Sequence, residues 1–182
     1  MITKESPLKG MTHGTVAKVA ISEIPNLPAF DIRVAPETSS HVAVENAIAV
    51  LLPVKQGLIG SSVSKDALCL GPDWWLIVGS SEVERMLAPL RSPNIHFSVV
   101  DVCGQRTTIE LEGPHAREAL AHLWDQDLRE KSFPVASVSQ GLMAKTPVIV
   151  WHIAQFRYRV MVRSSFALHL WKALVDAAEE WV

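Results

Sequence analysis

Asp101, Cys103 and His96 are the side chains whose types could support nucleophilic catalysis, as a carboxylate, a thiol and an imidazole. Their spacing along the chain does not test whether they meet. A cysteine that follows an apolar segment and precedes a glycine is also typical of an inert, half-buried thiol. Cys69, inside an alternating apolar segment, is a weaker candidate still. The sequence therefore predicts no catalytic residue.

A second group could bind a metal. His115, Glu118 and His122 are spaced so that all three lie on one side of a predicted helix. Two imidazoles and a carboxylate would suit zinc or iron, but no fourth ligand is readable, and this side lies opposite the apolar stripe of the helix. We expect a solvated polar face and no metal site.

A row of arginines is the most suggestive charged feature. Arg157, Arg159 and Arg163 alternate with apolar residues in a predicted strand, so their guanidinium groups share one face of the sheet if no bulge intervenes. Two interpretations remain open. The row is either a solvated outer face, or an ionic contact with an acidic partner surface or a carboxylate ligand such as folate.

The six tryptophans point either to the core or to an interface, because this residue is enriched in both. Trp74, Trp75 and Trp171 are the candidates for contact with a partner. Only 20% of the residues are charged and 48% are hydrophobic, so little charge is available to cover the surface. We therefore expect part of the surface to be covered by another protein.

Composition also excludes several classes of protein. Proteins that bind nucleic acid usually carry an excess of positive charge that neutralises its phosphates. The net charge here is -2, so no nucleic-acid partner is expected. Two cysteines cannot build a disulfide framework, and neither G-x-G-x-x-G nor a Walker motif is present, so we expect no cofactor in this chain. No apolar run reaches the roughly 18 residues of a membrane span, and the first ten residues lack a signal-peptide core. The sequence predicts a cytoplasmic protein without membrane contact.

The elements that would position these side chains fall into two halves. Prolines and glycines in residues 1–28 favour an extended N-terminal arm. Residues 29–103 are predicted to hold a strand, a helix, a hairpin across 66–78 and a second helix that begins with a capping box of Ser81 and Glu84. Residues 104–182 are predicted to repeat this order, with strands at 107–111, 148–153 and 158–162. Ser164 or Ser165 is expected to cap the closing helix.

An internal repeat supports this division. Shifting the sequence by 84 residues aligns 56–58 with 140–142, both Gln-Gly-Leu, and aligns Val78 with Val162. Strands that arrive as hairpins with helices between them favour a mainly antiparallel sheet. We therefore predict the α+β class, with two ferredoxin-like β-α-β-β-α halves, each with extra short strands, that form one compact unit.

Four segments together resemble the gamma subunit of heterotetrameric sarcosine oxidase. They are VDVCGQRTTIELEGPHAREALAHLW, DLREKSFPVASVSQGLMAKTPVIVWHI, VMVRSSFALHLWKALVDAAEE and, in the first half, LGPDWWLIVG. The resemblance covers the chain from about Ser98 onward, and it depends on the order and spacing of structural motifs. It implies a fold like the folate-binding domain of glycine-cleavage aminomethyltransferases, and a chain without catalytic residues of its own.

The same resemblance implies the partners and the reaction. Alpha, beta and delta subunits would join this chain in a complex that oxidises sarcosine with O2 and passes the one-carbon unit to tetrahydrofolate. FAD, FMN, NAD, tetrahydrofolate and zinc would belong to those partners. The alternative is a stand-alone folate-binding, aminomethyltransferase-like protein whose Arg157 face holds the glutamate tail of folate.

Overall fold

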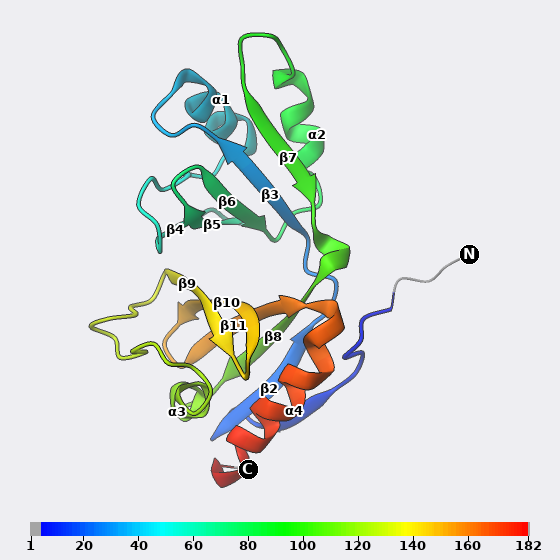
Figure 1. The fold of residues 1–182 in the computed structure, drawn as a ribbon, viewed down its shortest axis with the longest axis vertical. Helices are drawn as coiled ribbons and strands as arrows, with labels where there is room; N and C mark the ends of the chain where they lie inside the picture. The colour runs from blue at the N-terminus through cyan, green and yellow to red at the C-terminus, as the bar shows by residue number, and fades with distance from the viewer. Residues whose placement is uncertain (1–4, 182) are drawn as a thin grey trace. The chain divides into compact units, whose positions relative to one another are not determined.

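A computed structural model describes residues 5–181, which form two compact units. Among the described residues, unit 1 comprises residues 5–26 and 104–181, and unit 2 comprises Leu27–Cys103. Both units combine antiparallel sheet with short helices, which confirms the predicted α+β class (Figure 1). Within the described residues, no helix has the length and apolar character needed to cross a membrane.

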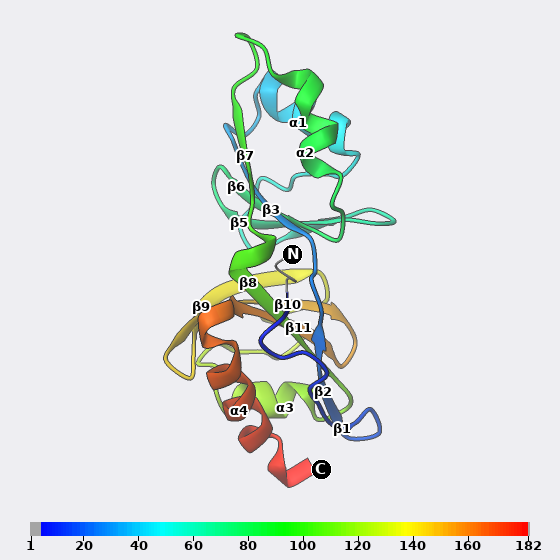
Figure 2. The same ribbon diagram turned by 90° about the vertical axis from the view of Figure 1, so that its right-hand side faces the viewer.

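Unit 2 is a five-stranded antiparallel sheet with two helices on one face (Figure 2). The strand order is β4-β5-β6-β3-β7. The elements in chain order are β3 Ala29–Val34, α1 Ser39–Ile48, β4 Ile59–Ser61, β5 Asp66–Gly71, β6 Trp74–Val78, α2 Val83–Leu87 and β7 Phe97–Asp101. The core between sheet and helices includes Ile32 and Trp75 from the strands and Val44 and Leu87 from the helices. Their burial is the main force that holds the helices to the sheet.

Unit 1 is a six-stranded antiparallel sheet in the order β1-β2-β8-β11-β10-β9. The elements are β1 Thr12–Thr15, β2 Val19–Ile24, β8 Arg106–Glu112, α3 Ala116–Ala121, β9 Ser137–Met143, β10 Thr146–Ala154, β11 Arg157–Arg163 and α4 Ala167–Ala177. Leu120 of α3 and Leu170 of α4 pack against Ile109 and Val160 of the sheet. One face of the sheet is therefore the core face, and the side chains that alternate with these point to the other face.

The two units repeat one topology. The order β3-α1-β4-β5-β6-α2 in unit 2 matches β8-α3-β9-β10-β11-α4 in unit 1, and the strands are arranged as β4-β5-β6-β3 and β9-β10-β11-β8. Each repeat holds one strand more than the predicted β-α-β-β-α pattern. The added strands are β4, which has three residues, and β9, whose Ser, Gln and Gly residues carry little strand propensity.

Each repeat gains its fifth strand from the chain segment that precedes the other repeat. β2 leads directly into β3 but pairs with β8, whereas β7 leads into β8 but pairs with β3. The repeats are therefore linked by an exchange of strands, and neither sheet is complete without residues from outside its own repeat.

The predicted extended arm over residues 1–28 differs from the structure. Residues 1–4 lie outside the described residues, but β1 and β2 form a hairpin, and β2 joins the sheet of unit 1 with Ile21 opposite Leu111. Val19 and Ile21 are fully buried in the core of this unit. The apolar alternation of β2 is satisfied by β8, a partner about ninety residues away that no local pattern indicates.

The predicted helix caps at Ser81 and at Ser164 or Ser165 are also wrong. The residues before α2 and α4 are Glu82 and Phe166, and neither makes a side-chain cap hydrogen bond. Both have helical backbone angles, whereas a capping side chain needs an extended backbone to reach back to the first turn. Thr38, which is extended, does cap α1 by accepting a hydrogen bond from His41 N at 3.2 Å.

Candidate functional site

Arg157 and Arg159 do share a face of β11, as the alternation predicts, but a carboxylate of the same unit occupies them. Glu110 of β8 lies directly opposite Arg159 in the register. Its two oxygens accept hydrogen bonds from Arg157 Nη2 at 2.7 Å and from Arg159 Nε at 2.8 Å. The arrangement is an internal clamp in which one buried carboxylate joins two guanidinium groups.

Burial makes the loss of one partner from this clamp more costly than in a surface ion pair. The Glu110 side chain is 7% exposed, and Arg159 is 20% exposed. The hydrogen bond that Arg157 donates to Glu110 raises the pKa of Arg157, and the Glu112 carboxylate, 3.8 Å from Arg157 Nε, adds electrostatic attraction. Because both guanidiniums already have a carboxylate partner, an external anion would compete with Glu110 for their positive charge. The clamp is therefore structural in character.

Arg163 lies apart from the clamp. It is exposed at the end of β11, directly opposite Arg106 in the register. The predicted row of three arginines is thus two residues held by Glu110 and a third at the rim of the sheet. The sequence analysis did not identify Glu110 as a partner of the arginines. A signal was present, because the alternation in residues 108–112 (Thr-Ile-Glu-Leu-Glu) places Glu110 on the face opposite Ile109.

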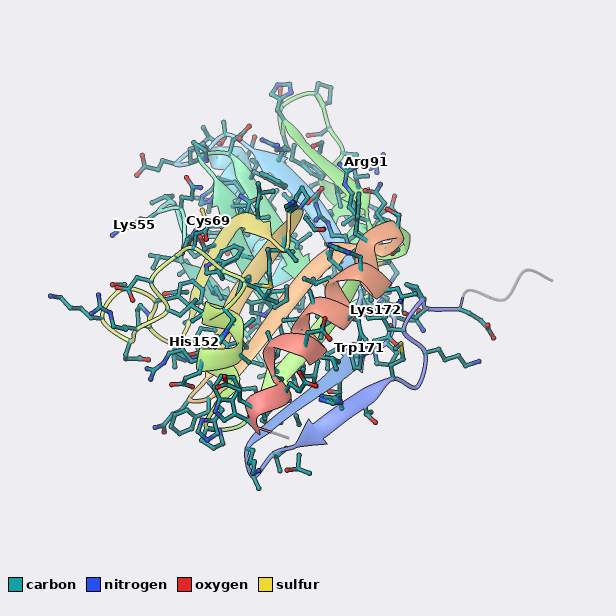
Figure 3. The ribbon with its side chains drawn as sticks, turned by 60° about the horizontal axis from the view of Figure 1, so that its bottom comes forward. Lys55, Cys69, Arg91, His152, Trp171 and Lys172 are labelled. Atoms are coloured by element: carbon teal, nitrogen blue, oxygen red, sulfur yellow. The ribbon has the colours of Figure 1, made fainter. Side chains whose placement is uncertain are left out.

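Two of the three candidate interface tryptophans belong to the core. Trp75 is fully buried and donates a hydrogen bond from Nε1 to Pro53 O at 2.9 Å. Trp171 of α4 is 4% exposed and packs in the core of unit 1 (Figure 3). Neither side chain is free to contact a partner without rearrangement of the core.

Trp74 is the tryptophan of this set that reaches the surface. It is half-buried, and its Nε1 donates to Asp31 Oδ1 at 3.0 Å. The guanidinium of Arg33 lies 4.6 Å from the centre of its ring and is paired with Asp73 at 2.8 Å. This cluster combines a cation–π contact with two hydrogen bonds, which fixes the Trp74 ring in one orientation.

Asp101, Cys103 and His96 do not form a catalytic group in the structure. Asp101 Oδ1 accepts a hydrogen bond from the backbone N–H of Cys103 at 2.8 Å, and the thiol lies against the backbone of Ala29. His96 is exposed, and its backbone N–H donates to the hydroxyl of Ser40. Burial, followed by the hydrogen bond with Asp101, raises the pKa of Cys103. A raised pKa keeps the thiol neutral, the opposite of what nucleophilic catalysis requires.

This environment predicts slow thiol chemistry. We expect iodoacetamide to modify Cys103 at pH 7.5 more slowly than a peptide thiol, because the raised pKa of Cys103 lowers the fraction of this thiol that is present as the reactive thiolate. The rate should keep rising with pH beyond the ordinary thiol pKa. The measurement is a labelling time course at several pH values, read by peptide mass spectrometry. Cys69, which is buried and whose pKa is also raised by burial, should react more slowly still. Rapid labelling of Cys103 at pH 7 would contradict this account.

The His115, Glu118 and His122 face holds an aromatic contact. The ring of His115 stacks on Trp181 at 5.5 Å, and the ring of His122 meets it edge-on at 5.6 Å. Glu118 accepts a hydrogen bond from Arg117 at 3.1 Å. Across residues 5–181, no group of three or more His, Cys, Asp or Glu side chains is placed to hold a metal ion. The two imidazoles fasten the C-terminal turn to α3.

Comparison with known proteins places this fold in a family. The model described as "Sarcosine oxidase, gamma subunit family" matches residues 34–180. "Sarcosine oxidase subunit gamma" of Corynebacterium sp. (strain P-1) is 29% identical over 181 residues, which cover 97% of this chain and 87% of the relative. The protein of the same name from Corynebacterium sp. (strain U-96) is 30% identical over 166 residues, covering 90% of this chain and 80% of the relative.

Solved structures agree with this assignment. A chain of "Heterotetrameric Sarcosine Oxidase from Corynebacterium sp. U-96 in complex with pyrrole 2-carboxylate" superposes with a TM-score of 0.88 and 26% identity, covering 97% of this chain and 95% of that chain. Glycine cleavage system aminomethyltransferase T from Bartonella henselae superposes with a TM-score of 0.62 and 12% identity, covering 87% of this chain and 46% of that one. The second likeness concerns the fold alone and confirms the expected similarity of fold to aminomethyltransferases. The family match over most of the sequence, with a relative 30% identical across 90% of it, shows that this chain belongs to the sarcosine oxidase gamma subunit family.

Proposed function

We propose that this chain is a structural, non-catalytic subunit of a heterotetrameric sarcosine oxidase. The partners are alpha, beta and delta subunits, which hold FAD, FMN, NAD, tetrahydrofolate and zinc. The complex oxidises sarcosine with O2 and yields glycine, H2O2 and, through tetrahydrofolate, 5,10-methylenetetrahydrofolate. The observation that carries the proposal is the superposition, almost end to end, on a chain of a heterotetrameric sarcosine oxidase.

The internal use of the reactive side chains supports a structural role. Glu110 accepts hydrogen bonds from Arg157 and Arg159, the half-buried Cys103 thiol contacts the backbone of Ala29, and the rings of His115 and His122 contact Trp181. Each of these groups stabilises its own unit. Side chains that are committed to packing and ion pairing contribute to the fold, and a subunit whose work is assembly needs a stable fold above all.

Omission of the chain tests this proposal. The alpha, beta and delta subunits are co-expressed with and without this protein, and the purified material is assayed for flavin absorbance and sarcosine-dependent H2O2 formation. We expect the chain to co-purify with the flavin-containing subunits, and its omission to lower the yield of active complex. Normal assembly and turnover in its absence, with the chain recovered as a separate monomer, would contradict the proposal.

The fold likeness to aminomethyltransferase T favours one rival, a stand-alone folate-binding protein. Titration of the isolated chain with tetrahydrofolate separates the two functions, with tryptophan fluorescence and calorimetry as readouts. Our proposal expects no saturable signal up to millimolar ligand, because Glu110 already pairs with the charge of Arg157 and Arg159. Saturable binding that is lost in an Arg159→Met variant would favour the rival.

A further inference from the structure

Among residues 5–181, β7 is the sheet edge with the least protection against another strand, and Asp101 at its end is its one charged residue. Soluble proteins usually shield sheet edges by shortness, glycine, charge or a covering loop. β7 runs for five residues, Phe-Ser-Val-Val-Asp, without Lys, Pro or Gly, and pairs with β3 along one side. At the edge of the five-stranded sheet it offers a regular extended backbone.

The other three sheet edges, formed by β4, β1 and β9, are less suited to pairing with a further strand. β4 has three residues, and β1 has four, one of them Gly14 with a φ of 71°. β9 is covered along part of its length, because Trp124 forms a β-bridge with Met143 and the side-chain amide of Gln126 donates to Gln140 O at 3.2 Å. The contrast singles out β7 as the edge available to a further strand.

The register of β3 and β7 defines which backbone groups face outward. Val102 N donates to Ala29 O at 2.9 Å, and in an antiparallel pair the hydrogen-bonded positions alternate. Ser98 and Val100 therefore turn their backbone N–H and C=O groups toward β3. Phe97 and Val99 turn theirs away from the sheet, and these groups have no partner among residues 5–181.

The side chains of β7 hold this edge in place. Phe97 and Val99 are partly buried and pack against the core of unit 2, whereas Ser98 and Val100 are exposed, Val100 by 52%. A hollow of about 420 Å³ adjoins the strand, lined by Arg91, Ser92, Ile95, Phe97, Ser98 and Val99. The strand is thus anchored from within and open along its outer side.

Charge indicates what kind of segment fits here. Arg91, labelled in Figure 3, precedes β7 in the chain; its side chain is 63% exposed, and a carboxylate oxygen of Glu84 lies 3.6 Å from its Nη2. A surface pair of this kind contributes little, so Arg91 remains available to a stronger partner. The hollow would accept apolar side chains, and Arg91 would pair with a carboxylate. The site therefore suits an extended peptide that carries both apolar and acidic residues.

We infer that an extended segment of another subunit of the sarcosine oxidase complex adds to β7 as a sixth strand. Its backbone pairs with the outward groups of Phe97 and Val99, and an acidic side chain of the segment meets Arg91. This mode of binding takes its affinity from main-chain hydrogen bonds and its specificity from the flanking pockets. The inference rests on the proposed function, because that function supplies a partner chain.

Hydrogen exchange tests the pairing directly. The full chain alone and the purified complex are compared by exchange mass spectrometry with fragmentation to single residues. We expect the amides of Phe97 and Val99 to exchange rapidly in the isolated chain and at least about a hundredfold more slowly in the complex, whereas Ser98 and Val100 are slow in both. A complex that forms but leaves Val99 unprotected overturns the inference and leaves the proposed function standing.

A matched pair of variants provides a second test. Val99→Pro removes the outward backbone N–H. Val99→Ala shortens the same side chain but keeps that N–H. We expect Val99→Pro to lower the affinity for the other subunits roughly tenfold or more beyond the effect of Val99→Ala. A tenfold loss corresponds to about one or two lost hydrogen bonds. Circular dichroism checks that both variants fold, and the exchange experiment on the unmodified chain decides the question if one does not.

Each remaining outcome has a defined meaning. Equal assembly of the two variants, or an isolated chain that dimerises with Val99 protected, overturns the inference, the second because the occupant would be another copy of this protein. Failure of the unmodified chain to join any complex refutes the proposed function instead. Arg91→Glu should weaken assembly, and the weakening should diminish at high salt, because the charged contact is screened.

Discussion

Replacement of Trp75 by alanine is expected to lower the free energy of unfolding by about 4 kcal/mol. The side chain is fully buried between β6 and the helices of unit 2, where its neighbours include Ile32 and Ile77. The His41 ring lies 5.3 Å away, and Pro53 O accepts the indole hydrogen bond. Because a domain of this kind is stable by only about 5–15 kcal/mol in total, the loss is a large fraction of its stability.

A milder variant separates the two contributions. Trp75→Phe keeps an aromatic ring but leaves Pro53 O without its donor, so we expect a loss of about 1–2 kcal/mol plus a smaller packing term. Urea unfolding followed by circular dichroism measures both, since removal of a tryptophan complicates fluorescence. A loss below about 1 kcal/mol for Trp75→Ala would show that this site is not the centre of the unit 2 core.

Glu110→Gln is expected to destabilise the protein by about 2–3 kcal/mol, because it removes the negative charge that two partly buried guanidiniums share. This loss is at or below the roughly 3–5 kcal/mol that is usual when one partner of a buried ion pair is removed. The reason is that Arg157 is 39% exposed, so water can solvate its charge. Urea unfolding of the purified chain provides the measurement. The effect should exceed that of any surface charge in the same sheet.

Glu112→Gln is the matched control. Glu112 is 47% exposed and lies 3.8 Å from Arg157 Nε, so its removal should cost less than about 1 kcal/mol. In a Glu110→Gln, Arg159→Met double variant, part of the loss should be restored, because the two changes remove partners of the same pair. Equal losses for the two single glutamate variants would show that Glu110 holds no special clamp.

Alternation along the chain predicted the faces of the strands correctly. It placed Arg157 and Arg159 on one face, and residues 66–78 form the expected hairpin. The same alternation was present at Glu110, but a strand pattern does not name the neighbouring strand. The clamp depends on β8 and β11 being adjacent and in register, and that pairing is a property of the whole sheet.

Non-local pairing also explains the missed N-terminal strands. Prolines and Gly14 in the first 28 residues carry the local signal of a loop, whereas Val19 and Ile21 become strand residues because β8 offers them a buried partner. Similarly, Trp74 and Trp75 are adjacent in the chain, so local composition does not distinguish them. Only the packing of the sheet decides that Trp75 is in the core and Trp74 at its surface.

The repeat was read correctly in outline and wrongly in one detail. Val78 and Val162 are equivalent, since they pair with Asp66 and Val148 in matching hairpins. In the neighbouring pairs Asp66 faces Ser61 and Val148 faces Gly141, so Gly141 corresponds to Ser61. The Gln-Gly-Leu match at residues 56–58 is therefore coincidental, because the connections between strands differ in length and a constant shift cannot follow them.

Native mass spectrometry of the purified complex tests whether this chain is a structural gamma subunit. We expect an intact assembly of four different chains that contains one copy of this protein, and dissociation of that copy as a folded subunit without flavin. A fully active assembly from which this chain is absent, or a copy of the chain that is ejected with bound flavin, would contradict its assignment as a structural gamma subunit.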